Sequence, residues 1–146
     1  MPRSAKPDAV ALLKEDHRKV EDLFEKFEKA RDADRKKSLA QEICTELTIH
    51  AMIEEEIFYP SCQGKIEEED VLEEAYVEHD GAKVLISEIM SDMDADFFEA
   101  KVTVLSELIK HHVKEEEKRS DGLLAQGKAA GLDMEALGDR IIARQR

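Results

Sequence analysis

The chain has 146 residues, of which 35 are acidic and 22 basic, giving a formal net charge of −13. This length predicts one domain with one continuous core, and six glycines and three prolines are too few for the frequent turns of a β-sandwich or barrel. The acidity disfavours a nucleic-acid partner or an anionic membrane surface, because both require clustered lysine and arginine.

Apolar residues at three- and four-residue steps predict four long helices in succession. The first runs from about residue 8 to residue 30, the second ends before Pro60, the third starts at IEEED (66–70), and the fourth fades after Lys118. RDAD (31–34), PSCQG (60–64) and SDMDAD (91–96) are the predicted loops, with Asp32 or Asp34 as the N-cap of the second helix. This pattern predicts an all-α fold, an antiparallel up-down-up-down four-helix bundle.

A shorter segment follows the predicted bundle. The glycines at 122, 127 and 131 indicate a loosely held connection, and the apolar spacing of Met134, Leu137, Ile141 and Ile142 predicts a short C-terminal fifth helix. We therefore expect an N-terminal tail (1–7), a bundle (8–120), and a loop with the C-terminal helix (121–146). Residues 1–17 contain no apolar run typical of a signal sequence, and no later stretch could span a bilayer, so we expect a cytoplasmic protein.

Four of the five histidines are regularly spaced. The sequence numbers of His17 and His50 differ by 33, as do those of His79 and His112, and the second pair follows the first at an offset of 62. Residues equally far from a turn lie at the same height in an antiparallel hairpin. The midpoints of 17–50, 50–79 and 79–112 are 33.5, 64.5 and 95.5, in or beside the three predicted loops. Four helices should therefore each bring one histidine to a common level, roughly 20–25 Å from the turns.

Two glutamates accompany these histidines. Glu54 follows His50 at i+4 and Glu116 follows His112 at i+4, so each pair projects from one helix face. The two pairs are themselves related by the offset of 62. Imidazoles and carboxylates from facing helices are how bundles build dinuclear metal sites. Imidazole nitrogen suits iron, zinc or copper, whereas mixed nitrogen and oxygen sites with open positions suit iron that handles oxygen.

Four segments carry a family resemblance: DHRKVEDLF (16–24), HAMIEEEIFYP (50–60), EHDGAKVLI (78–86) and HHVKEEE (111–117). They resemble the four helical motifs of the hemerythrin-like family, the HHE cation-binding domains. The resemblance implies a non-haem di-iron centre with two Fe ions bridged by carboxylates. By position, the resemblance assigns the terminal ligands to His17, His50, His79 and His112. It assigns the bridging ligands to Glu54 and Glu116.

The third motif departs from that of the oxygen-carrying hemerythrins, which have two histidines four residues apart there. This chain has only His79, with Ala75 before it and Lys83 after it. A carboxylate or water could complete the coordination, and the candidate side chains are Glu21, Glu55, Glu78 and Glu117. We expect His112 rather than His111 to point inward. We also expect Tyr59 and Tyr76 to pack at the bundle ends, and Cys44 and Cys62 to be reduced thiols.

The function predicted from these features is that of a di-iron protein that binds or senses oxygen, nitric oxide, peroxide or iron, with a small diatomic ligand or peroxide as its partner. One alternative is an enzyme that decomposes peroxide or reduces oxygen at the same centre. The other is a helical interaction module, which could form a homodimer, with a vestigial metal site.

Overall fold

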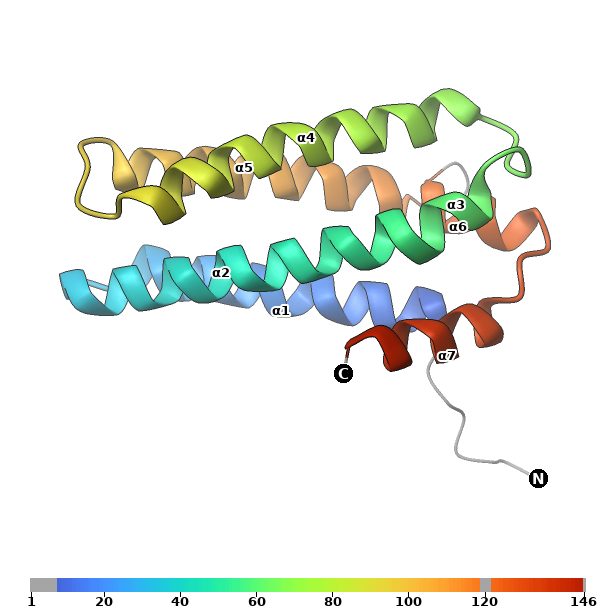
Figure 1. The fold of residues 1–146 in the computed structure, drawn as a ribbon, viewed down its shortest axis with the longest axis horizontal. Coiled ribbons are helices and arrows are strands. Elements are labelled where there is room, and N and C mark those ends of the chain that lie inside the picture. Colours follow the sequence, from blue (N-terminus) through green and yellow to red (C-terminus); the bar gives the residue numbers. More distant parts are fainter. Residues whose placement is uncertain (1–7, 119–121, 146) are drawn as a thin grey trace.

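The computed structural model describes residues 8–118 and 122–145, and within them it contains helices and no strand. The predicted antiparallel four-helix bundle is confirmed (Figure 1). Each of its helices contacts two others of the bundle, which closes the four into a ring. The bundle helices are α1 (Ala9–Lys29), α2 (Ala33–Ile53), α4 (Glu69–Ser91) and α5 (Phe98–Glu117). The predicted tail of residues 1–7 lies outside the described residues.

Aspartates cap the first two helices. The Asp8 carboxylate accepts a hydrogen bond from the Ala11 N–H at 2.9 Å, and Asp32 does the same for Arg35 at 2.9 Å. Each therefore satisfies one of the free N–H groups of a helix start. Of the two cap residues proposed for α2, the cap is Asp32.

Helix α2 ends at Ile53, before Pro60 as predicted, but the predicted loop does not begin at Pro60, because the chain stays helical to Cys62. The chain passes from α2 into a π-helical turn, η1 (Glu54–Phe58), and then into α3 (Tyr59–Cys62), which contains Pro60 (Figure 1). A proline in an α-helix has no N–H for the carbonyl four residues back and its ring presses on that carbonyl. Here the preceding turn is widened, with the Tyr59 N–H donating to the Glu54 carbonyl five residues back, and the helix continues.

The widened turn changes which side chains share a face. The bond from the Tyr59 N–H to the Glu54 carbonyl places these two residues one above the other on the helix. Both side chains are fully buried between the bundle helices. The π-helical turn thus brings an acid and a phenol to the same part of the interior.

The connection after the bundle is not loosely held as predicted. Residues Leu123–Ala129 form helix α6, and four of its residues are buried: Leu123, Leu124, Gln126 and Gly127. A Cβ added to Gly127 would lie 3.2 Å from Met134 Cε and 3.3 Å from Phe58 Cζ, so this glycine permits a close approach of neighbouring elements. The predicted C-terminal helix is confirmed as α7 (Met134–Gln145), which packs on α1.

The core consists of two apolar clusters separated by a layer of buried polar side chains. The loop-end cluster lies toward the α1–α2 and α4–α5 connections and consists of Val20, Leu23, Phe24, Phe27, Leu39, Ala40, Ile43, Cys44, Leu47, Ala82, Ile89, Val102 and Leu105. The α3-end cluster consists of Ala9, Leu13, Ile53, Ile57, Phe58, Tyr59, Cys62, Ile66, Leu72, Ala75, Leu123, Leu124, Met134, Leu137 and Ile141. Among the described helices, none is long and apolar enough to cross a membrane.

The two cysteines are free and buried, one in each cluster. Eighteen residues of helical chain separate Cys44 from Cys62, or ~27 Å at the rise of an α-helix, which is too far for a disulfide within the chain. The expectation of two reduced thiols agrees with this placement.

Both thiols should be unreactive in the native protein. Burial raises the pKa of Cys44 to about 11 and that of Cys62 to about 12. At pH 8 their thiolate fractions are then at least roughly a hundredfold below that of an ordinary cysteine. A thiol titration with a chromogenic disulfide should find two thiols per chain in denaturant and very slow reaction without it. Rapid reaction of either thiol in native protein would contradict this burial.

Phe97 precedes α5 in a left-handed backbone conformation with φ of 69°, and 76% of its surface is exposed. This conformation costs a residue with a Cβ roughly 1–2 kcal/mol, whereas glycine adopts it freely. We expect the free energy of unfolding of Phe97→Gly to be about 0.5–1 kcal/mol higher than that of the matched control Phe97→Ala, after allowing for the greater freedom of glycine in the unfolded chain. Urea unfolding of the two variants measures this difference, and a more stable alanine variant would argue against the left-handed turn.

Candidate metal centre

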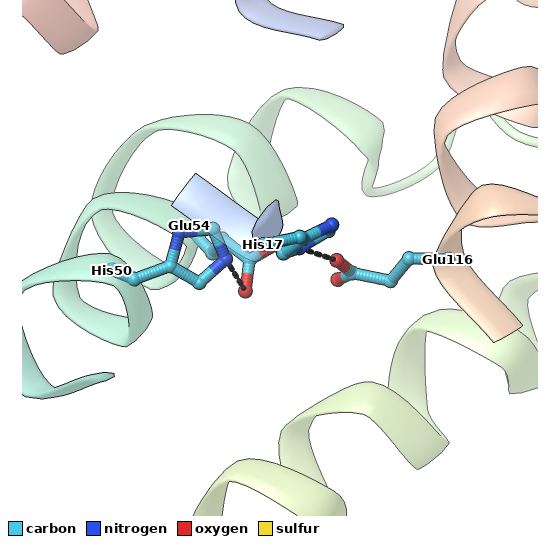
Figure 2. A group of neighbouring side chains, drawn as sticks. All are labelled: His17, His50, Glu54 and Glu116. Carbon is cyan, nitrogen blue, oxygen red and sulfur yellow. Dashed lines mark ion pairs between the residues drawn. The ribbon is translucent and has the colours of Figure 1, made fainter. Parts of the chain in front are cut away.

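Six buried side chains meet in the polar layer between the two apolar clusters. Each bundle helix contributes one histidine, η1 contributes Glu54 and α5 contributes Glu116, and none of the six is more than 7% exposed. Their nitrogen and oxygen atoms form two groups, each with all donor atoms within 4.8 Å of one another. The members are His17, His50, Glu54 and Glu116 in the first group (Figure 2), and Glu54, His79 and His112 in the second.

The two inner glutamates, Glu54 and Glu116, lie between the groups. Glu116 reaches His17 Nε2 with one oxygen at 3.2 Å and His112 Nε2 with the other at 3.1 Å. Glu54 Oε1 lies 3.3 Å from His50 Nε2 and 3.0 Å from His79 Nε2. Figure 2 shows two of these contacts, that of Glu54 with His50 and that of Glu116 with His17. Each inner glutamate thus contacts one histidine of each pair, as a bridging carboxylate must.

Each of the four histidines also has a carboxylate behind it, on its Nδ1. The distances from Nδ1 to the carboxylate oxygen are 2.5 Å for His17, 3.0 Å for His50, 2.8 Å for His79 and 2.6 Å for His112. A carboxylate that accepts the Nδ1 proton orients the ring and leaves Nε2 for a cation. These outer carboxylates are Glu117 for His17, Asp16 for His50, Glu55 for His79 and Glu78 for His112.

Of the four candidates for completing the coordination, three are outer carboxylates. Glu55, Glu78 and Glu117 bind Nδ1 atoms, on the far side of the rings from the inner glutamates. Glu21 lies on the surface and pairs with Arg18 at 2.9 Å. The adjacent His111 is 59% exposed, with Nε2 3.4 Å from Glu78, whereas His112 points inward as expected.

The outer carboxylate that sequence reasoning missed is Asp16, yet the offset of 62 contains the signal for it. Asp16 precedes Glu78 by that same offset, and both bind the histidine 34 residues later in the chain. Glu55 likewise precedes Glu117 by the same offset. The repeat that relates the histidines therefore extends to the carboxylates behind them, and the centre has approximate internal twofold symmetry.

The inner groups strongly shift one another's ionisation. Burial opposes the charge of Glu54, but His50, His112 and His79 hold its pKa well below the usual range. Burial likewise disfavours the charged form of His50, yet Glu54 and the hydrogen-bonded Asp16 raise its pKa to about 10. Without a metal, the Glu54 carboxylate therefore faces a protonated His50, and a cation binding between them would displace the proton.

The donor set fits two cations. Among the described residues, four inner atoms are buried without a hydrogen bond: His17 Nε2, His50 Nε2, Glu54 Oε2 and Glu116 Oε1. Buried polar atoms without partners are rare unless they bind an ion or water. The six carboxylates carry six negative charges, and Arg18 and Lys83 pair with two of the outer ones at 2.8 Å. With neutral histidines four negative charges remain, matching two divalent ions.

A cavity of about 250 Å³ adjoins the centre on the side of the loop-end cluster. All four inward histidines line it, and most of the remaining wall is apolar. Its exposed lining residues are Thr48 on α2 and Lys83 and Ser87 on α4, so it reaches the surface between these helices.

Tyr59 approaches the centre from the opposite side. The expectation that it only packs at a bundle end was incomplete: its ring belongs to the α3-end cluster, but its hydroxyl donates to Glu116 and lies 3.1 Å from Glu54 Oε1. Burial and the two inner glutamates raise its pKa well above the ordinary value. Tyr76 packs edge-on against the Tyr59 ring, with centroids 5.2 Å apart.

The fold and the motifs both have known counterparts. The sequence model of the hemerythrin HHE cation binding domain matches residues 8–119. The crystal structure of a hemerythrin HHE cation binding domain-containing protein from Mycobacterium kansasii matches the fold with a TM-score of 0.78 at 22% identity, over 94% of this chain and 84% of that chain.

A second relative matches in sequence. The chain is 31% identical over 107 residues to a DNA nickase from Nostoc sp., a match that covers 73% of this chain and 30% of the nickase. The chain thus spans less than a third of the length of that relative. Because the HHE model matches most of the chain, this protein belongs to the hemerythrin HHE cation-binding domain family.

Proposed function

We propose that this protein holds a non-haem di-iron centre and uses it to bind or sense a small ligand: oxygen, nitric oxide or peroxide. The observation that carries the proposal is the arrangement of two histidine pairs around two shared glutamates, with four inner atoms that have no hydrogen bond. His17 and His50 would hold one ion, His79 and His112 the other, and Glu54 and Glu116 would bridge them.

Iron is supported by the chemistry of the donors. Four imidazoles and two carboxylates form a mixed nitrogen and oxygen set, which suits iron that reacts with oxygen, whereas neither cysteine is among the inner groups. Iron bound with an open coordination position supplies affinity for small ligands and the capacity to change oxidation state. The outer carboxylates keep the imidazole rings in place whichever ligand is bound.

The cavity supports a small and weakly polar ligand. Its volume of about 250 Å³ includes room for a diatomic molecule or peroxide beside the histidines, and its apolar walls exclude most hydrogen-bonding partners. Val20, Leu47 and Ile109 supply much of this wall. A ligand entering between α2 and α4 would meet the Nε2 face of the histidines without displacing the outer carboxylates.

The nickase relative does not change this proposal. The match covers 30% of that protein, and the activity in its name belongs to the whole of it. A formal charge of −13 disfavours contacts with a phosphate backbone. We therefore propose a small-molecule partner and not DNA.

Metal analysis tests the proposal. After anaerobic loading with Fe(II) and desalting, wild-type protein should retain two irons per chain and unfold at a higher temperature than the metal-free protein, because binding stabilises the folded state. His79→Ala should retain one iron or none. The matched control His111→Ala, at the exposed neighbour of an inward histidine, should retain two. A wild-type chain without stoichiometric iron would refute the proposal and favour an interaction module.

The role of the cavity can be tested separately from iron retention. Ala82 is buried and lines the cavity, so Ala82→Phe should fill it and weaken the binding of nitric oxide to the reduced centre, by about tenfold or more, with two irons retained. Val84→Phe is the control, because Val84 lies on the same helix and is 59% exposed. Equal affinities in optical titrations of both variants would contradict ligand entry through the cavity.

The enzymatic alternative uses the same residues and is distinguished by turnover. Rapid and repeated oxygen evolution on adding peroxide to the loaded protein would identify a peroxide-decomposing enzyme. A reversible change in the optical spectrum on adding and removing oxygen, without turnover, would identify a carrier or sensor.

A further inference from the structure

Tyr59 is placed among the metal-binding groups more closely than packing or capping requires. Its hydroxyl oxygen lies 3.1 Å from Glu54 Oε1, 3.2 Å from His79 Nε2 and 3.3 Å from His112 Nε2, and it donates a hydrogen bond to Glu116 Oε2. The side chain is fully buried. It therefore touches every member of the second metal-binding group and one oxygen of the other inner glutamate.

Hydrogen bonding alone does not account for these neighbours. A phenol has one proton to donate, yet the Tyr59 oxygen faces two carboxylates. Whichever carboxylate accepts this proton, the oxygen of the other faces the phenol oxygen without a proton between them. Oxygen and nitrogen donors gathered around a common point are the arrangement expected of a cation site.

The spacing agrees with this interpretation. Neighbouring donors of a six-coordinate ion with bonds of ~2.1 Å lie ~3.0 Å apart. The contacts of the Tyr59 oxygen with Glu54, His79 and His112 lie between 3.1 and 3.3 Å, and His79 Nε2 is 3.2 Å from His112 Nε2. The phenol oxygen therefore lies about as far from these atoms as neighbouring ligands of one cation lie from each other.

We infer that Tyr59 is a ligand of the iron held by His79 and His112, bound through its phenolate oxygen. The inference rests on the proposed di-iron centre and specifies how one half of it is completed. It also accounts for the single histidine of the third motif, because Tyr59 supplies a donor where the oxygen-carrying hemerythrins have another imidazole.

The phenolate makes the two halves of the centre unequal. The position related to Tyr59 by the internal repeat is Asp121, which lies outside the described residues, so no second tyrosine follows the repeat. The His79 and His112 half would carry one more negative charge than the His17 and His50 half and would stabilise the higher oxidation state of its iron. The cavity lies on the other side of the centre from Tyr59, so the phenolate does not compete with an entering ligand.

The chain offers a direct test because Tyr59 and Tyr76 are its only tyrosines. The full chain is loaded anaerobically with Fe(II), oxidised with ferricyanide, desalted, and examined for iron content, visible absorption and resonance Raman scattering. Wild type and Tyr76→Phe should hold two irons and show the phenolate-to-iron charge-transfer band with its phenolate ring vibrations. Tyr59→Phe should lose both the band and the vibrations.

The result does not depend on how well Tyr59→Phe folds, because Tyr59 is the only tyrosine that remains in the Tyr76→Phe variant. Phenolate vibrations in that variant establish Tyr59 as the ligand. Two irons without phenolate vibrations, in wild type or Tyr76→Phe, overturn this inference and leave the di-iron proposal standing. A charge-transfer band that persists in Tyr59→Phe also overturns it. A wild-type chain without iron overturns the proposed function and this inference together.

Discussion

The burial of Glu54 and Glu116 is the constraint on which the rest of the structure depends. Two carboxylates at 0% and 2% exposure would destabilise a helical core strongly if they had no charged partners. Four imidazoles meet them at 3.0–3.3 Å, one from each bundle helix, and this fixes the heights of all four helices relative to one another. The outer carboxylates fix the rings in turn. The apolar clusters on either side can stabilise the bundle, but they do not determine its register.

The same constraint explains what could be predicted from the sequence. The internal repeat and the equal distances from three loops place His17, His50, His79 and His112 at one level, because helix rise is regular and side-chain direction follows from position. The same helix geometry predicts that Glu54 and Glu116 project from the same helix faces as His50 and His112, because each lies four residues after its histidine. The outer carboxylates follow the repeat as well, but whether an acid faces the metal side or the Nδ1 side of a ring depends on the rotation of each helix by tens of degrees. Periodicity alone does not determine that rotation, so the sequence leaves Glu55, Glu78 and Glu117 as candidate ligands and does not identify Asp16.

The errors share a physical cause, which is that tertiary packing overrode a local rule. Pro60 predicts the end of a helix, yet the π-helical turn at Glu54–Phe58 accommodates it and the chain stays helical to Cys62. Gly127 predicts looseness, yet it permits the close contact of α6 with Phe58 and Met134. Both residues lie at the α3 end, where the chain departs from regular α-helix geometry to close the core. Local propensity is least informative in such regions.

The π-helical turn links this departure to the centre itself. In a regular α-helix a residue five positions after Glu54 would be rotated well away from it, whereas the bond between the Tyr59 N–H and the Glu54 carbonyl stacks the two. The extra residue in the turn therefore delivers the Tyr59 hydroxyl to the inner glutamates, from a helix that already provides His50 and Glu54. The matching segment of α5 carries His112 and Glu116 and ends at Glu117, with no π-helical turn among its residues. The internal repeat builds two equivalent pairs of histidines, and the π-helical turn at Glu54–Phe58, which has no second example in the described part of the chain, makes their surroundings different by placing a phenol beside His79 and His112.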